Sequence, residues 1–113
     1  MSTEIRQLEP RAVWNKFADL NAVPRPSKKE ERVIAFIKDF GASLSLEVIE
    51  DSVGNVIIKK SATVGMEDRK PIVMQSHLDM VHQKNNDTNF DFLTQGIEMH
   101  VVGDWVKANG TTL

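Results

Sequence analysis

Apolar residues near the start of the chain recur with the period of an α-helix. Val13, Phe17 and Leu20 follow the spacing i, i+4, i+7, which places them on one face of a helix over about residues 9–20. Two prolines in residues 22–26 then interrupt this pattern, because proline lacks an amide donor and moves the residue before it out of the helical region. The pattern predicts a first amphipathic helix.

A second helix is predicted between Ser27 and Gly41. Ser27 and Glu30 have the spacing of a capping box, in which each side chain accepts a hydrogen bond from the other residue's backbone amide. Gly41 is typical of the residue that follows a helix C-terminus. The apolar face between them consists of Val33, Phe36, Ile37 and Phe40.

Further along the chain the apolar period changes to two, which indicates β-strands. Residues 44–49 alternate, residues 50–55 are rich in turn-forming types, and residues 56–58 are apolar again, so a hairpin is expected. A second hairpin is expected where residues 97–101 alternate and, after a Gly-Asp turn, residues 105–107 return.

A short apolar run, Ile72-Val73-Met74, lies between the two hairpins and is typical of a central strand that is covered on both faces. No segment within these residues covers the second face, so we expect an exposed apolar surface there. The order of elements predicts the α/β fold class, with two helices followed by a mixed sheet with hairpins. Nothing resembles an interdomain linker, and residues 1–113 are interpreted as part of one domain.

Composition and charge exclude several classes of partner. The chain has 14 Lys and Arg against 16 Asp and Glu, and its net charge of −2 gives no basic face for nucleic acid. No apolar run reaches the roughly 18–20 residues of a membrane-spanning helix. With no cysteine there is neither a disulfide framework nor thiolate chemistry. We therefore expect a cytoplasmic protein with no nucleic-acid or membrane partner.

The most informative short motif is His77-Leu78-Asp79, which follows the predicted strand at residues 72–74. The carboxyl edge of a sheet is where open α/β folds bind ligands. An imidazole can bind Zn²⁺, and a nearby carboxylate can bind it too or can orient another ligand. A structural alternative stays open, in which His77 bonds to a carboxylate and caps the strand. One histidine is also not enough, because a catalytic zinc takes about three protein ligands.

The other ligands would come from His82, His100, nearby carboxylates or residues that this chain lacks, but a direct role is not favoured for either histidine, and three aspartates are assigned no chemistry. His82 lies in a loop, where histidine is usually solvated, and His100 is expected on the outer face of a hairpin strand. Asp87, Asp91 and Asp104 occupy turn-like contexts, in which aspartate commonly bonds to the backbone.

Five segments together resemble one known family. They are residues 24–27, 51–56, 65–71, 73–88 and 103–113, and they extend over nearly the whole chain. In these segments the sequence resembles the bacterial aminoacyl-histidine dipeptidases, which are di-zinc metallopeptidases related to carnosinase and aminoacylase.

The resemblance implies a function and assigns two residues. His77 would be a zinc ligand, and Asp79 would be the catalytic carboxylate that lies behind the site, orients a ligand and tunes the metal. The substrates would be small dipeptides such as carnosine, hydrolysed by a water that two zinc ions activate.

The resemblance also implies what these residues lack. In the family, the bridging aspartate, the general base and the remaining ligands follow the segment that matches residues 103–113, as does the lid and dimerisation domain. Residues 1–113 are therefore expected to be the N-terminal part of the catalytic domain and inactive alone, with a homodimer expected only for the full-length protein. The alternative is a free-standing small α/β module with a structural or binding role.

Overall fold

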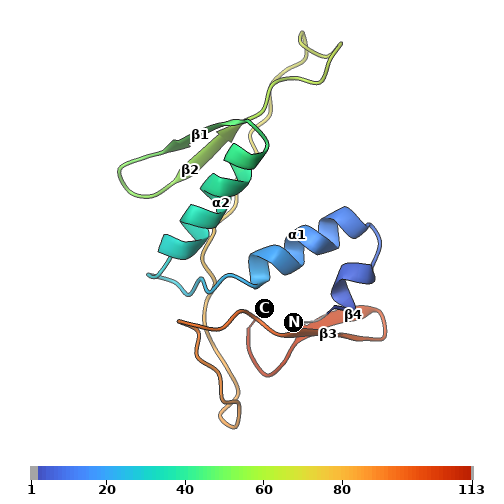
Figure 1. Ribbon diagram of the computed structural model, residues 1–113, viewed down its shortest axis with the longest axis vertical. Coiled ribbons are helices and arrows are strands. Elements are labelled where there is room, and N and C mark those ends of the chain that lie inside the picture. The colour runs from blue at the N-terminus through green and yellow to red at the C-terminus, as the bar shows by residue number, and fades with distance from the viewer. Residues whose placement is uncertain (1–2, 113) are drawn as a thin grey trace. The chain divides into compact units, whose positions relative to one another are not determined.

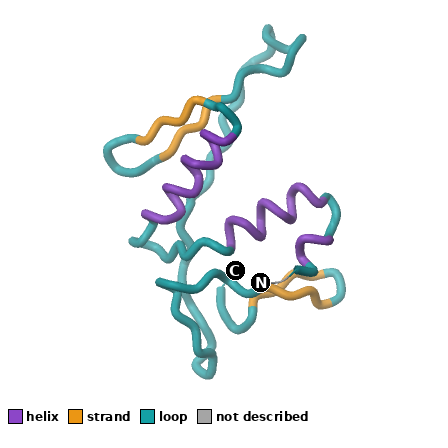
Figure 2. The backbone as a smooth tube through the Cα atoms, viewed as in Figure 1, coloured by secondary structure: helices purple, strands orange, loops and turns teal. Residues whose placement is uncertain are grey.

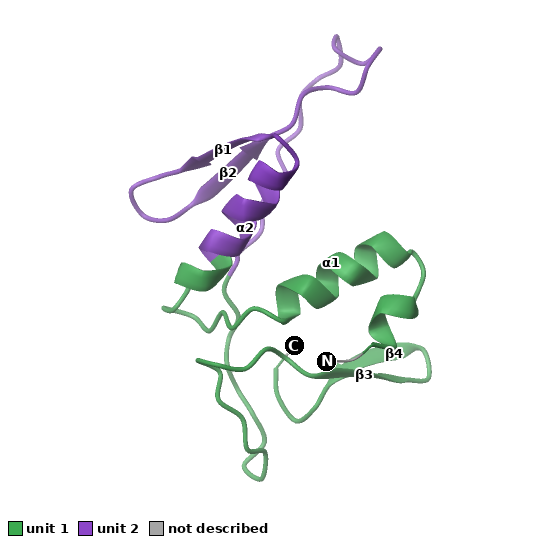
Figure 3. Ribbon diagram, in the orientation of Figure 1, with its two compact units in different colours: residues 1–33, 79–113 green, residues 34–78 purple. Residues whose placement is uncertain are grey.

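The computed structural model describes residues 3–112, which divide into two compact units (Figure 3). One unit contains the described parts of residues 1–33 and 79–113, and the other contains residues 34–78. None of the described helices is long and apolar enough to cross a membrane. In chain order the elements are η1 (Ile5–Gln7), α1 (Arg11–Asn21), α2 (Glu31–Ser43), β1 (Glu47–Glu50), β2 (Val56–Lys59), β3 (Met99–Val102) and β4 (Trp105–Ala108) (Figure 1).

Both predicted hairpins are confirmed. β1 pairs antiparallel with β2, with Val48 opposite Ile58, and β3 pairs antiparallel with β4, with Val101 opposite Val106. Each hairpin is a separate two-stranded sheet among the described residues. Two helices followed by antiparallel hairpins agree with the α/β fold class expected from the order of the periodic segments.

The core of the first unit lies between α1, η1 and the β3–β4 hairpin, as Figure 1 shows. Ile5 on η1 is completely buried, and Ala18 and Met99 approach it from α1 and β3. The apolar face predicted for the first helix holds only in part, because Phe17 packs on this core whereas Val13 is 61% exposed and Ala18 is the buried apolar position of α1. Partly buried side chains that pack on this centre are Leu8, Trp14, Phe17, Ile97, Val101 and Val106.

In the second unit, the β1–β2 hairpin packs closely on α2. A Cβ atom on Gly41 would lie 2.6 Å from Cγ2 of Val48 and 3.1 Å from Cδ1 of Ile58. Gly41 therefore sits inside the helix, where its small size permits the contact, and the prediction that it ends the helix is wrong. The helix continues to Ser43, and Ser45 with φ 56° takes the left-handed conformation that follows the helix.

The predicted capping box of Ser27 and Glu30 is also wrong, because α2 begins only at Glu31. The Glu30 carboxylate accepts a hydrogen bond from the backbone N–H of Lys28 at 2.7 Å. Lys28 has φ 73°, so the chain turns between Ser27 and the helix. The Ser27 hydroxyl bonds to a residue far away in sequence and does not cap the helix.

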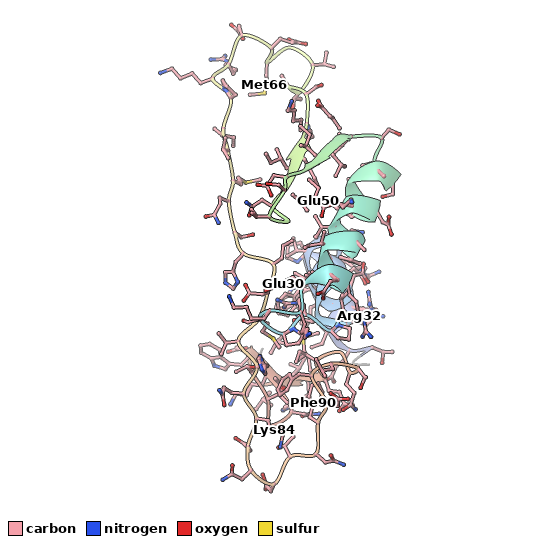
Figure 4. All side chains as sticks on the ribbon, turned by 90° about the vertical axis from the view of Figure 1, so that its left-hand side faces the viewer. Glu30, Arg32, Glu50, Met66, Lys84 and Phe90 are labelled. Carbon is pink, nitrogen blue, oxygen red and sulfur yellow. The ribbon has the colours of Figure 1, made fainter. Side chains whose placement is uncertain are left out.

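The strand predicted at residues 72–74 does not form. Ile72, Val73 and Met74 are 82%, 93% and 89% exposed, and they lie in the long loop region between β2 and β3 that Figure 2 draws in teal. Met66, labelled in Figure 4, lies in the same region, between β2 and residues 72–74. A strand needs a hydrogen-bonded neighbour, and the described strands pair only within the two hairpins. These apolar side chains are exposed as expected, but on a loop and not on the face of a sheet.

Candidate functional site

Asp79 lies where two segments far apart in sequence meet within the first unit. Pro26 and Met80 form a parallel bridge. The N–H of Met80 donates to the carbonyl of Arg25 at 2.9 Å, and the N–H of Ser27 donates to the carbonyl of Met80 at 3.1 Å. Both bridge residues are buried. The backbone next to Asp79 is therefore fixed by hydrogen bonds and by packing.

The Asp79 side chain is half-buried and is bound by a hydroxyl. Oγ of Ser27 donates to Oδ2 of Asp79 at 2.5 Å, a distance in the range of a charge-assisted hydrogen bond. The carbonyl of Met80 lies farther from the same hydroxyl, at 3.3 Å. The carboxylate is the stronger acceptor, so the hydroxyl holds Asp79 in one orientation.

Arg25 connects this carboxylate to the end of α1. Burial lowers the pKa of Arg25, while attraction to the Asp79 charge acts in the opposite direction. Nη2 of Arg25 donates to Oδ1 of Asn21 at 2.8 Å, and Asn21 itself is completely buried. Nδ2 of Asn21 in turn donates to the carbonyl of Phe17 at 3.1 Å. Hydrogen bonds therefore link α1 to Arg25, and charge attraction links Arg25 to Asp79.

The structure places the two predicted site residues in different units. His77 is exposed and belongs to residues 34–78, whereas Asp79 belongs to the other unit. No strand is assigned over residues 71–79, so the strand-end setting expected for the motif does not form. Asp79 is instead brought together with Ser27 and Arg25.

The donor set of the described residues fits part of a zinc site. An imidazole and a carboxylate in one motif are ligand types that zinc accepts. Within residues 3–112, however, no three His, Asp or Glu side chains gather closely enough to hold a metal ion. These residues do not make a complete metal site, and the roles expected for His77 and Asp79 stay predictions.

The other two histidines have distinct surroundings. His82 is exposed, as expected, and its ring centroid lies 5.7 Å from that of Phe92. With Ser27 and Phe90 it lines an open hollow of about 420 Å³ in the first unit. His100 lies opposite Lys107 and is only half-buried, but its Nδ1 is buried with no hydrogen-bond partner in the described part of the chain. The expectation of an outward-facing His100 therefore holds only in part.

Asp91 has the backbone role expected of it. Its Oδ1 accepts from the N–H of Leu93 at 2.9 Å, and its Oδ2 accepts from the hydroxyl of Thr94 at 2.8 Å. These bonds favour the ionised form, so the pKa of Asp91 lies below its ordinary value. In Figure 4 the neighbouring Phe90 marks this loop.

Sequence reasoning missed Arg25, Ser27 and Asn21 as neighbours of the candidate site. Arg25 and Ser27 stand in a segment that carries the family resemblance, but Ser27 was explained by a local capping motif. Its actual partner is 52 positions away, a separation that no local spacing rule detects. Asn21 directly follows the predicted first helix, and nothing in the sequence distinguishes it from an ordinary residue at a helix end.

Comparison with known proteins identifies relatives that match nearly the whole chain. This chain is 48% identical over 111 residues to the cytosol non-specific dipeptidase of Escherichia coli (strain K12). It also superposes on a solved structure of aminoacylhistidine dipeptidase from Vibrio alginolyticus with a TM-score of 0.92 and 42% identity. No protein-family model matches the chain.

The matches cover most of this chain but a minority of each relative. The first covers 98% of this chain and 23% of the E. coli protein, and the second covers 96% and 22%. The chain therefore spans a little under a quarter of the length of either relative. Both comparisons confirm the family resemblance that the sequence motifs indicate.

Proposed function

Since the chain is related to the aminoacyl-histidine dipeptidases in sequence and structure, we propose that its 113 residues serve as part of a zinc-dependent dipeptidase. The substrates are small aminoacyl-histidine dipeptides such as carnosine. The observation that carries the proposal is the 48% identity to a dipeptidase over 111 residues. In this proposal the activity belongs to a longer protein that contains these residues.

Within that protein, His77 is proposed to bind a zinc ion and Asp79 to orient a ligand from behind the metal. Asp79 is suited to this role because its carboxylate is half-buried and held by the Ser27 hydroxyl at 2.5 Å. A carboxylate that bonds to a metal-binding imidazole fixes the direction of the ring and raises its basicity. No three ligand side chains gather within residues 3–112, so the remaining zinc ligands are proposed to come from outside these residues.

Zinc, when bound, would supply the Lewis acidity that activates water and polarises the peptide carbonyl. The contribution of this chain is to hold an imidazole and a carboxylate in place. We propose a cytoplasmic location, supported by the cytosolic relative, and a homodimer only for the longer protein.

A chimaeric enzyme tests the proposal. The segment of the E. coli dipeptidase that these residues match is replaced by residues 1–113, and hydrolysis of carnosine is measured with and without zinc. We expect zinc-dependent hydrolysis. His77→Ala should lower kcat/KM by at least about 100-fold, because changing residues that only support a metal ligand already costs 10–100-fold.

His82→Ala is the matched control, because it removes a second exposed histidine five positions along the chain. Its kcat/KM should change by no more than about threefold, as for surface substitutions in general. A folded chimaera without zinc-dependent activity would contradict the proposal. Equal effects of the two histidine substitutions would contradict the role of His77.

The isolated 113-residue chain distinguishes this proposal from a free-standing binding or structural module. We expect no carnosine hydrolysis and no tight zinc site in calorimetric titration, because the described residues hold no group of three ligands. A tight site that His77→Ala removes would instead indicate a self-contained metal module. Hydrolysis by the isolated chain would show that the residues assumed to be essential elsewhere are not needed.

A further inference from the structure

Two residues that act on Asp79, Arg25 and Ser27, neither bind the metal nor take part in the chemistry of the function proposed above. Ser27 acts on the Asp79 carboxylate through a hydrogen bond to Oδ2 at 2.5 Å, and Arg25 acts on it through charge attraction. All three residues belong to the same compact unit. Their arrangement is therefore a local property of that unit.

Backbone hydrogen bonds set the register of this cluster. The Met80 peptide donates to the carbonyl of Arg25 at 2.9 Å and accepts from the N–H of Ser27 at 3.1 Å. Because Met80 follows Asp79 directly, these two bonds fix the backbone from which the carboxylate projects. Met80 is only 7% exposed, so packing supports the hydrogen bonds.

Arg25 is itself held in position by α1. Its guanidinium donates to Oδ1 of the buried Asn21 at 2.8 Å, and the carbonyl of Asn21 accepts from the N–H of Ile97 at 2.8 Å. A partly buried cation is costly unless it is paired. The negative charge of Asp79 offsets part of that cost, and the charge of Arg25 in turn attracts the carboxylate.

A hydrogen bond is an effective constraint on an aspartate, because rotation about its Cβ–Cγ bond is only weakly restricted otherwise. We propose that Ser27 and Arg25 are positioning residues for Asp79, holding its carboxylate in the orientation in which it supports zinc binding. This inference rests on the proposed function. It assigns the Ser27 hydroxyl and the Arg25 guanidinium to the same task, one by a directional bond and the other by charge.

The chimaeric enzyme provides the test, with zinc affinity as a readout separate from activity. The zinc dissociation constant is measured by competition with a chromophoric chelator, and kcat and KM are measured separately. We expect Ser27→Ala to weaken zinc binding by about 10–100-fold and to lower kcat with little change in KM. Ser27→Thr keeps the hydroxyl and should restore both.

Matched controls separate positioning from general stability. Ser43→Ala also removes a hydroxyl bond, to the carbonyl of Phe40 at 2.7 Å, but on α2. Arg25→Gln should weaken zinc binding, whereas Arg32→Gln removes an exposed guanidinium that bonds to the carbonyl of Leu93 at 2.8 Å. Both controls should change zinc affinity by no more than about twofold, as expected for exposed positions.

A double-mutant cycle tests whether Ser27 affects zinc binding through the carboxylate of Asp79. In an Asp79→Asn background, Ser27→Ala should have no further effect on zinc affinity, because the group it positions is already changed. Additive effects would overturn the inference. Zinc affinity that stays unchanged in both Ser27→Ala and Arg25→Gln would also overturn it, whatever happens to the unfolding midpoint.

The two proposals fail in different ways. If the unsubstituted chimaera folds but neither binds zinc nor hydrolyses carnosine, the proposed function fails, and this inference fails with it. If the chimaera is active and Ser27→Ala and Arg25→Gln behave like their controls, only the positioning role is wrong. Should Ser27→Ala not fold, Arg25→Gln decides the question.

Discussion

The side chain of Asp51 organises the turn between β1 and β2. Its Oδ1 accepts from the N–H groups of Val53 and Asn55, each at 2.9 Å, and its Oδ2 accepts from the Asn55 side chain at 2.8 Å. The Asn55 side chain is the largest of the causes that lower the pKa of Asp51, followed by the backbone donors. A local motif in the sequence is therefore realised by local hydrogen bonds.

This lowered pKa predicts an acid-sensitive turn. The pKa of Asp51 is lower in the folded chain than in the unfolded chain. Ionised Asp51 therefore stabilises the turn fully at pH values above its pKa in the unfolded chain. That stabilisation is lost as the pH falls through the lowered value. In an NMR titration, the amide signals of Val53 and Asn55 should move together at a pH below the ordinary range of aspartate.

Two variants make this titration specific. Asp51→Ala should remove the shared acid transition of Val53 and Asn55. Asp68→Ala, in the exposed loop after β2, should leave it unchanged. A transition at the ordinary pKa of aspartate would contradict the role given to the turn bonds.

At the scale of elements, Gly41 decides how α2 and the β1–β2 hairpin pack. Alanine is favoured over glycine in a helix by about 1 kcal/mol. Here the added Cβ would lie 2.6 Å from Val48, a short side chain that cannot move far, and such overpacking costs about 1–3 kcal/mol. We expect Gly41→Ala to lower the free energy of unfolding, as measured in urea.

A second background tests the cause. Val48→Ala removes the nearest atom that the new Cβ would meet, although it also removes packing of its own. In that background the side chain of Ile58, 3.1 Å from the new Cβ, still has to shift, so Gly41→Ala should destabilise less than it does in the unsubstituted chain. Stabilisation by Gly41→Ala in the unsubstituted chain would contradict the packing argument.

At the scale of the whole molecule, the apolar run at residues 72–74 predicts a weakly stable chain that self-associates. Val73 is 93% exposed, and the backbone around it lies in no strand. An exposed apolar segment of this kind favours association between chains. We expect a low unfolding midpoint for the isolated chain, together with a concentration-dependent increase of mass in light scattering.

Val73→Lys tests this segment both in the isolated chain and in the chimaeric dipeptidase. In the isolated chain it should reduce self-association without lowering the midpoint, because the side chain is already in solvent. In the chimaeric dipeptidase, where the run has the pattern of a covered strand, it should lower the midpoint. A cooperative, monomeric isolated chain with a high midpoint would contradict the first expectation.

The sequence by itself determined both helices, both hairpins and the turn role of Asp91, because each depends on contacts between residues close together in the chain. The family resemblance was likewise carried by short segments, and the comparisons confirm it. His77 and Asp79 were chosen from the same kind of local motif, and their roles stay predictions.

Only the tertiary structure decided what Ser27, Gly41 and residues 72–74 do. Ser27 bonds to Asp79 instead of capping a helix. Gly41 does not end α2 but allows the β1–β2 hairpin to pack closely on it. The run at residues 72–74 stays in solvent because no described strand pairs with it. The physical reason is common to all three: the role of each residue depends on a partner that is distant in sequence, and periodicity reports only on the faces of single elements.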